Sequence, residues 1–189
     1  MIRVLTLAAL PAVLLASGAV AQAPPHAQQP YAGLHARTVK ALSDQQIADL
    51  RAGRGMGLAL PAELNGYPGP MHVLEHADAL GLDPAQRERT RTLFEAMRAE
   101  AVPLGERLIQ EEAELDRLFA TKTIQPVTLD AATAAIGAAQ GALRAAHLRY
   151  HLATVDVLTP EQVRRYAELR GYGGGGPAPS EHGHGAHAR

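Results

Sequence analysis

The sequence contains no cysteine and no tryptophan among its 189 residues, and aromatic residues make up only 4% of it. Without cysteine, the protein has no disulfide and no thiolate for catalysis or metal binding. Basic residues are not in excess either, because the formal net charge is −1. Nucleic-acid binding draws on clustered lysine and arginine and on aromatic stacking, so we do not expect nucleic acid as a partner.

Only one long apolar run occurs, at the beginning of the chain. Arg3 gives it a short basic start, Pro11 interrupts it, and small residues follow up to Ala23. This order is typical of a secretory signal peptide, and the run is short and alanine-rich next to the ~20 strongly apolar residues of a membrane span. We therefore expect residues 1–23 to be removed on export and the mature protein to be periplasmic, without stable membrane insertion.

A five-residue pattern occurs three times in the chain. Its copies are Leu42-Ser43-Asp44-Gln45-Gln46, Leu82-Asp83-Pro84-Ala85-Gln86 and Leu158-Thr159-Pro160-Glu161-Gln162. In each copy the second residue is a good N-cap, and the glutamine three residues later can bond back to it, which forms a capping box. Proline at the first helical position fits as well, because no backbone hydrogen bond is lost there. The pattern predicts three helix starts.

These copies resemble the LTxxQ motif of the Spy/CpxP group of periplasmic proteins, over about residues 42–172. The third copy matches the motif fully, the second has aspartate in place of threonine, and the first is the loosest. The group includes ATP-independent stress chaperones and heavy-metal sensors or resistance proteins. The resemblance implies a helical hairpin fold and one of these functions.

The apolar spacing predicts an all-α fold. Apolar residues three and four apart repeat from Asp83 to about Phe119 and again from Thr128 to Val157, as in two long helices packed side by side. Pro103 is expected to bend the first of them. Shorter helices are predicted over residues 43–54, 71–80 and 159–170, with a Gly/Pro-rich connector over residues 53–70. The predicted architecture is a long antiparallel helical hairpin with short flanking helices.

The expected organisation is a signal peptide (1–23), a flexible arm (24–41), a helical domain (42–172) and a Gly/His-rich disordered tail (173–189). A second apolar edge on the last long helix, at Leu148, Leu152 and Val155, is more than one hairpin partner can cover. This surplus favours a homodimer or a docked short helix.

Four of the nine histidines form two pairs with a spacing of four residues, His72 with His76 and His147 with His151. Residues four apart share one helix face, so each pair can offer two imidazoles to one ion. If the short helix folds back over the hairpin, both pairs lie at about the same level along it. Counting along the first long helix to that level reaches Glu95.

The predicted metal site therefore consists of His72, His76, Glu95, His147 and His151, with Glu75 and Glu88 as alternative carboxylates. Imidazoles with carboxylates suit zinc, nickel, cobalt or copper(II) better than calcium or magnesium. The set is similar to the site of the nickel/cobalt-type sensors of the same family, in which a methionine stands at the position of His151. Solvated or core-edge histidines are the alternative interpretation. His182, His184 and His187 in the tail predict only weak metal capture.

The segment from His72 to His76 also reads HxxEH, the pattern of inverted zinc proteases. Those enzymes contain sheets and substrate clefts, neither of which this sequence predicts, so we do not expect an enzyme. The leading hypothesis is a divalent transition-metal-binding protein that acts as a heavy-metal sensor or resistance factor, with an inner-membrane signalling partner if it is a sensor. The alternative is a Spy-like chaperone for unfolded client proteins, although such chaperones tend to be more basic.

Overall fold

The computed structural model describes residues 31–172, and the compact unit begins at Gly33. The helices are η1 (Leu34–Ala36), α1 (Asp44–Arg51), α2 (Leu60–Glu63), α3 (Pro70–Glu75), α4 (Pro84–Ala120), α5 (Pro126–Val155) and α6 (Pro160–Leu169). Residues 31–172 form no β-strand beyond an isolated bridge between Val39 and Leu42. The all-α prediction is confirmed, whereas the predicted signal peptide and the tail histidines lie outside the described residues.

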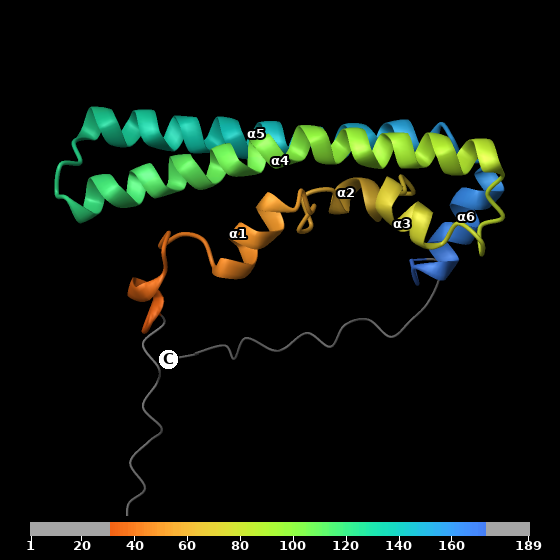
Figure 1. Ribbon diagram of the computed structural model, residues 1–189, viewed down its shortest axis with the longest axis horizontal. Helices are drawn as coiled ribbons and strands as arrows, with labels where there is room; N and C mark the ends of the chain where they lie inside the picture. The colour runs from red at the N-terminus through yellow and green to blue at the C-terminus, as the bar shows by residue number, and fades with distance from the viewer. Residues whose placement is uncertain (1–30, 173–189) are drawn as a thin grey trace, which may run out of the picture. The chain divides into compact units, whose positions relative to one another are not determined.

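The long helices α4 and α5 pack against each other as an antiparallel hairpin (Figure 1). Small residues line the contact, since Ala101 on α4 and Ala139 and Ala146 on α5 are almost fully buried. Small side chains let two helix backbones approach closely. Pro103, which was expected to bend the first long helix, lies inside α4, and α4 is unbroken from Pro84 to Ala120. The predicted hairpin is confirmed to within a few residues at each end.

One apolar core, which we call the hairpin cluster, joins α1 to the middle of α4 and α5. It consists of Val39, Leu42, Leu50, Ala101, Leu108, Ile109, Ile136, Ala139 and Leu143. Gly105 permits the close crossing of α1 over α4, because a Cβ there would lie 2.6 Å from the backbone oxygen of Leu50. Val39 belongs to the predicted flexible arm of residues 24–41, but the structure buries it in this core. The packed part of the chain therefore begins before residue 42.

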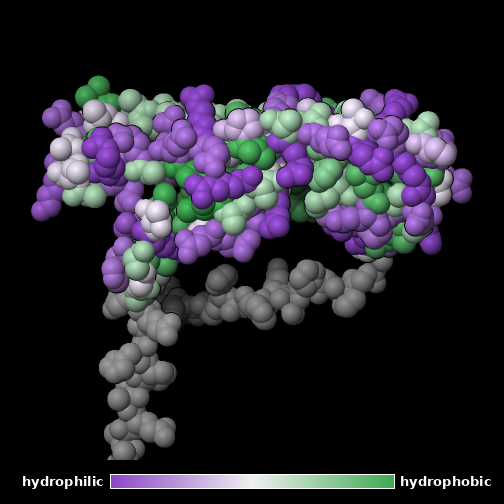
Figure 2. Space-filling view, viewed as in Figure 1, coloured by the Kyte–Doolittle hydropathy of each residue, from purple (hydrophilic) through white to green (hydrophobic). Residues whose placement is uncertain are grey.

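A second apolar core, the end cluster, lies where α3 and α6 meet the start of α4 and the end of α5. It consists of Val73, Ala77, Leu80, Leu82, Leu158 and Tyr166. On the face shown in Figure 2, hydrophilic residues cover most of the hairpin, and apolar residues show mainly beneath it, where the short helices pack. The short helices cover part of the hairpin, whereas Leu152, on the second apolar edge predicted for the last long helix, remains 54% exposed.

All three predicted capping boxes form, at Ser43, Asp83 and Thr159. The second and third copies of the motif also contact each other. The Nε2 of Gln86 donates to the Oε1 of Gln162 at 2.9 Å, and the Nε2 of Gln162 lies 3.0 Å from the Oε1 of Gln86. Gln86 Nε2 is also 2.9 Å from the carbonyl oxygen of Val157, at the end of α5. The motif therefore caps two helices and joins their ends.

The predicted helix over residues 71–80 is shorter than expected. Helix α3 ends at Glu75, and His76 is its C-cap, with φ −104° and ψ 15°. The chain then turns and reaches Gly81 in the left-handed conformation, at φ 63°. The backbone N–H of His76 still bonds the carbonyl of His72, but the His76 ring turns to Tyr166 of α6.

Candidate metal centre

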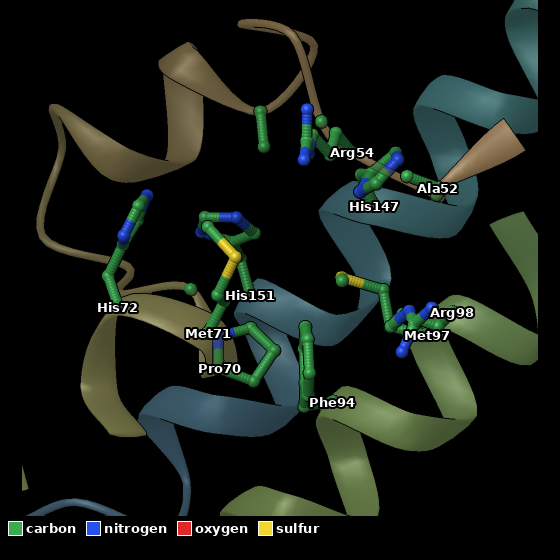
Figure 3. Close-up of a pocket in the computed structure, with 14 residues that line it drawn as sticks. Ala52, Arg54, Pro70, Met71, His72, Phe94, Met97, Arg98, His147 and His151 are labelled. Carbon is green, nitrogen blue, oxygen red and sulfur yellow. The ribbon is translucent and has the colours of Figure 1, made fainter. Parts of the chain in front are cut away.

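A cavity of about 290 Å³ lies where α3 and the connector meet the hairpin (Figure 3). Three helices supply most of its side chains: Pro70, Met71 and His72 from α3, Phe94, Met97 and Arg98 from α4, and His147 and His151 from α5. The rest of the wall is Ala52, Gly53, Arg54, Gly55, Ala59 and Gly69. We call it the histidine cavity. Of the five residues predicted to bind metal, three therefore line one space.

His147 is the most deeply buried of these histidines, with only 2% of its surface exposed. Its Nε2 atom is buried and has no hydrogen-bond partner within residues 31–172. Burial lowers the pKa of His147, and the nearby His151 lowers it further, so the ring is neutral near pH 7. An unpaired buried polar atom costs about 1–3 kcal/mol, so its retention requires an explanation.

The other buried polar side chains of the described region do have partners. Thr90 Oγ1 donates to the carbonyl of Gln86 at 2.8 Å, and Thr154 Oγ1 donates to the carbonyl of Tyr150. These bonds to the preceding helical turn are the usual solution for a buried threonine. His147 differs because its buried Nε2 has no such partner, although its ring belongs to a residue that lines the histidine cavity.

His151, one turn further along α5, has a fixed ring orientation. Its Nδ1 lies 2.7 Å from the carbonyl oxygen of Tyr67, so Nδ1 carries the hydrogen and donates it. In the neutral ring this leaves Nε2 with a free electron pair, the form in which histidine binds metal. Nε2 faces Gly69, where a Cβ would lie only 2.9 Å away. The absence of a side chain at Gly69 therefore keeps this nitrogen open.

Glu63, at the end of α2, is a buried carboxylate beside His151, with its Oε2 3.6 Å from His151 Nδ1. It accepts hydrogen bonds from Tyr166, from Tyr172 at 3.2 Å and from the backbone N–H of Gly69 at 3.3 Å. Burial raises the pKa of the Tyr166 hydroxyl, and Glu63 raises it further, so Tyr166 remains a neutral donor. Glu63 was not predicted from the sequence, although an acidic residue within the otherwise apolar run LALPAEL is a signal for a buried carboxylate.

His72 enters the histidine cavity from α3, on the other side from the α5 pair (Figure 3). It is partly exposed, and its Nδ1 is 2.8 Å from the Oε2 of Glu75. This contact leaves its Nε2 as the nitrogen available to a ligand. His72 is therefore placed as an outer member of the site.

The structure does not bring His76 or Glu95 to this cavity. His76 packs edge-on against Tyr166, with ring centroids 6.4 Å apart. Glu95 is exposed on α4, whereas its neighbour Phe94 lines the wall. Glu88, one of the alternative carboxylates, pairs with Arg91 at 2.6 Å. The second alternative, Glu75, reaches the cavity only through its contact with His72.

Residues 31–172 contain no preformed group of three or more His, Asp or Glu side chains able to hold a metal ion. The HxxEH segment likewise offers no two-histidine zinc site, because His72 faces the cavity while His76 contacts Tyr166. Two thioethers complete the set of donors in the wall, those of Met71 and Met97. Their spacing in the sequence does not relate them to the histidines, so they could not be predicted as ligands.

The donor set nevertheless fits a metal ion. His147 and His151 provide two free imidazole nitrogens one helical turn apart, with His72 and the thioethers in the same wall. Burial keeps the ring of His147 neutral, and the Tyr67 carbonyl orients that of His151. Such preset orientation is typical of metal-ligating histidines.

Comparison with known proteins gives an independent assignment. A family model described as heavy-metal resistance matches residues 56–165, more than half of the chain. The matched segment includes every histidine and both methionines of the cavity. No curated protein and no solved structure matches the chain. No helix among residues 31–172 is both long enough and apolar enough to cross a membrane. On the family match, the chain belongs to the heavy-metal resistance family.

Proposed function

We propose that the protein works in the periplasm as a heavy-metal sensor or resistance factor that binds its ion in the histidine cavity. The observation that carries this proposal is the buried, unpartnered Nε2 of His147, one helical turn before His151, whose Nδ1 is bonded to the Tyr67 carbonyl so that its Nε2 is free. The family assignment supports a role in heavy-metal resistance. The signal-peptide pattern of residues 1–23 supports export.

Packing alone does not account for these two residues. A leucine at position 147 would fill the same seam without leaving a polar atom unpaired, and burial of an unpaired polar group is unfavourable. An ion bound to the two α5 nitrogens would satisfy His147 and would use the orientation that the Tyr67 carbonyl gives to His151. His72 lines the same cavity from α3, at its outer side.

A sensing role requires a path from the ion to another part of the molecule. Glu63 provides one, because it lies 3.6 Å from His151 and accepts a hydrogen bond from Tyr166 of α6. A cation on His151 would strengthen the attraction between the imidazole and this carboxylate. The position of α6 would then depend on occupancy, and α6 would be the surface that an inner-membrane partner reads.

The test is metal binding by the full mature chain, residues 24–189, with His182, His184 and His187 replaced by alanine. Replacement of these three histidines excludes their contribution to the measured binding. We expect one bound ion, measured by titration calorimetry and by mass spectrometry of the metal. His147→Ala and His151→Ala should abolish binding, whereas His35→Ala, on an exposed part of η1, should leave it unchanged. Equal binding by all four proteins would refute the proposal.

A chaperone role is the second candidate, and one observation favours it. The connector and α3 expose several large apolar side chains close together in sequence: Met56, Leu60, Leu64, Tyr67 and Met71. An exposed apolar group of this kind is typical of a binding surface. Suppression of client aggregation by the metal-free protein, and its loss in a Leu60→Ser/Leu64→Ser variant, would support this function.

The homodimer expected from Leu148, Leu152 and Val155 stays a prediction.

A further inference from the structure

The donor atoms of the histidine cavity are softer than the sequence suggested. Besides the imidazole nitrogens of His147 and His151, the wall contains the thioethers of Met71 and Met97. Figure 3 shows both methionine side chains on the cavity side, Met71 from α3 and Met97 from α4. Thioether sulfur favours soft ions such as Cu(I), whereas carboxylate oxygen favours harder ones.

No carboxylate lines this cavity within the described region. Glu63 is the closest to His151, but Tyr166, Tyr172, the Gly69 N–H and Arg170 at 3.6 Å already occupy its oxygens. The carboxylate that the sequence analysis assigned to the site, Glu95, faces solvent. An ion bound in this cavity would therefore be bound by uncharged imidazole nitrogens and thioether sulfurs.

The charges in the wall are positive. Arg54 and Arg98 both line the cavity. Arg54 is partly neutralised by Asp49 at 2.6 Å, and the guanidinium of Arg98 lies over the ring of Phe94, 5.9 Å from its centroid. A cation held by neutral ligands in a partly buried site is repelled by such groups in proportion to its charge. Both arginines are exposed, so water and salt screen this repulsion, which is still about twice as large for a divalent ion as for a monovalent one.

The small number of donor atoms also favours a monovalent ion over a divalent one. Within residues 31–172 there is no group of three His, Asp or Glu ligands of the kind a divalent transition metal requires. Two imidazoles from one helix and a thioether from another element form a smaller set, which suits the low coordination numbers of Cu(I) and Ag(I). Met97 is buried beside this set, whereas Met71 is partly exposed at the mouth.

We infer that the histidine cavity is a site for a soft monovalent cation, Cu(I) or Ag(I), bound by His147 and His151 with the thioethers of Met97 and Met71. This inference rests on the proposed function and specifies its ion. It replaces the zinc, nickel, cobalt or copper(II) expected from the sequence. Met97 is the inner sulfur ligand, and Met71 closes the site from the solvent side.

The test uses the full mature chain with the three tail histidines replaced by alanine. Ag(I) is the first probe because it does not change oxidation state under these conditions, and Cu(I) follows under anaerobic conditions with a chromophoric chelator as competitor. Zn(II) and Ni(II) are titrated in parallel. We expect one equivalent of Ag(I) or Cu(I), bound at least about 100-fold more tightly than either divalent ion.

Met97→Leu and Met71→Leu then test the thioethers, because leucine keeps the size of the side chain and removes the sulfur. Each should weaken Ag(I) binding by about 10- to 100-fold, and sulfur scattering in the X-ray absorption spectrum of the Cu(I) form should decrease. Met56→Leu is the matched control, since Met56 is a partly exposed methionine outside this cavity. It should change neither measurement.

The outcomes separate the two proposals. Tight Zn(II) or Ni(II) binding that needs His147 and His151 but neither methionine would overturn the inference and leave the proposed function intact. Cu(I) binding that is insensitive to both Met→Leu changes would also overturn it. Binding of no ion by the folded protein would overturn both.

Discussion

The hairpin cluster and the histidine cavity lie on the same pair of helices, but their buried side chains differ in kind. Along α5 one stripe of buried positions consists of Ile136, Ala139 and Leu143 in the cluster and then His147, His151 and Thr154 at the cavity and beyond it, with Ala146 buried beside it. The steps of three and four residues do not change between them. The helix therefore keeps one buried stripe, and the stripe changes from apolar to polar within one turn.

This contrast shows that stability and binding are divided along the hairpin. In the hairpin cluster, burial of apolar surface is the main source of stabilisation. Near the cavity, polar atoms need specific partners, which come from short elements such as α2 and the Tyr67–Gly69 segment. The cavity end is therefore expected to depend on individual hydrogen bonds and charges more than on side-chain volume.

The largest effect is expected from Leu108→Ala in the hairpin cluster. Leu108 is buried, and removal of a buried leucine side chain costs about 2–5 kcal/mol of unfolding free energy. Denaturant unfolding at equilibrium measures this loss. Val127→Ala, at a position 70% exposed on α5, is the control and should change stability by no more than about 0.5 kcal/mol. Metal affinity of the folded Leu108→Ala protein should equal that of the parent, and a large decrease would contradict the division proposed above.

Glu63→Gln should have a smaller effect on stability but should also change the cavity. The substitution keeps the shape of the side chain and removes the buried charge that Tyr166, Tyr172 and Gly69 bond to. Hydrogen bonds to a charged group contribute about 1.5–3 kcal/mol, so a loss of this order is expected. Affinity for a cation should decrease as well, because the negative charge beside His151 is gone.

The matched control for this change is Glu161→Gln, an exposed glutamate in the first turn of α6. It should leave both unfolding free energy and metal affinity nearly unchanged. If Glu63→Gln lowered stability without lowering cation affinity, Glu63 would be a structural residue only.

The smallest expected effect concerns the paired motif copies. Gln86→Ala and Gln162→Ala, alone and together, form a double-mutant cycle whose coupling energy should be about 0.5–1.5 kcal/mol, because the two amides bond each other directly. Gln46 holds an equivalent capping box on α1 but does not contact Gln162, so the cycle between Gln46→Ala and Gln162→Ala should give a coupling near zero. Equal couplings in the two cycles would mean that the motif acts only as a cap.

The helices and their starts were predictable because their signals are local. A capping box depends on residues three positions apart, and the helical period is visible within a few turns. Most predicted boundaries of α4, α5 and α6 agree with the structure to within about two residues. Helix α3 was predicted too long because its apolar residues continue into the turn before Gly81.

The site was only partly predictable, because it depends on contacts between distant segments. Counting residues along α4 gave the correct level for the cavity but not the correct side: Phe94, Met97 and Arg98 line the wall, and Glu95 points away. One residue turns a helix by about 100°, so an error of one position moves a side chain off the site. Glu63 contacts Tyr166, 103 residues later, and no local pattern indicates such a contact.

The bond between His151 and the carbonyl of Tyr67 has a consequence for redesign of the cavity. The acceptor is main chain, so the orientation of the imidazole does not depend on which side chain stands at position 67. The Tyr67 side chain is 39% exposed. Side-chain substitutions at position 67 are therefore expected to be tolerated while the backbone continues to hold the histidine for its ligand.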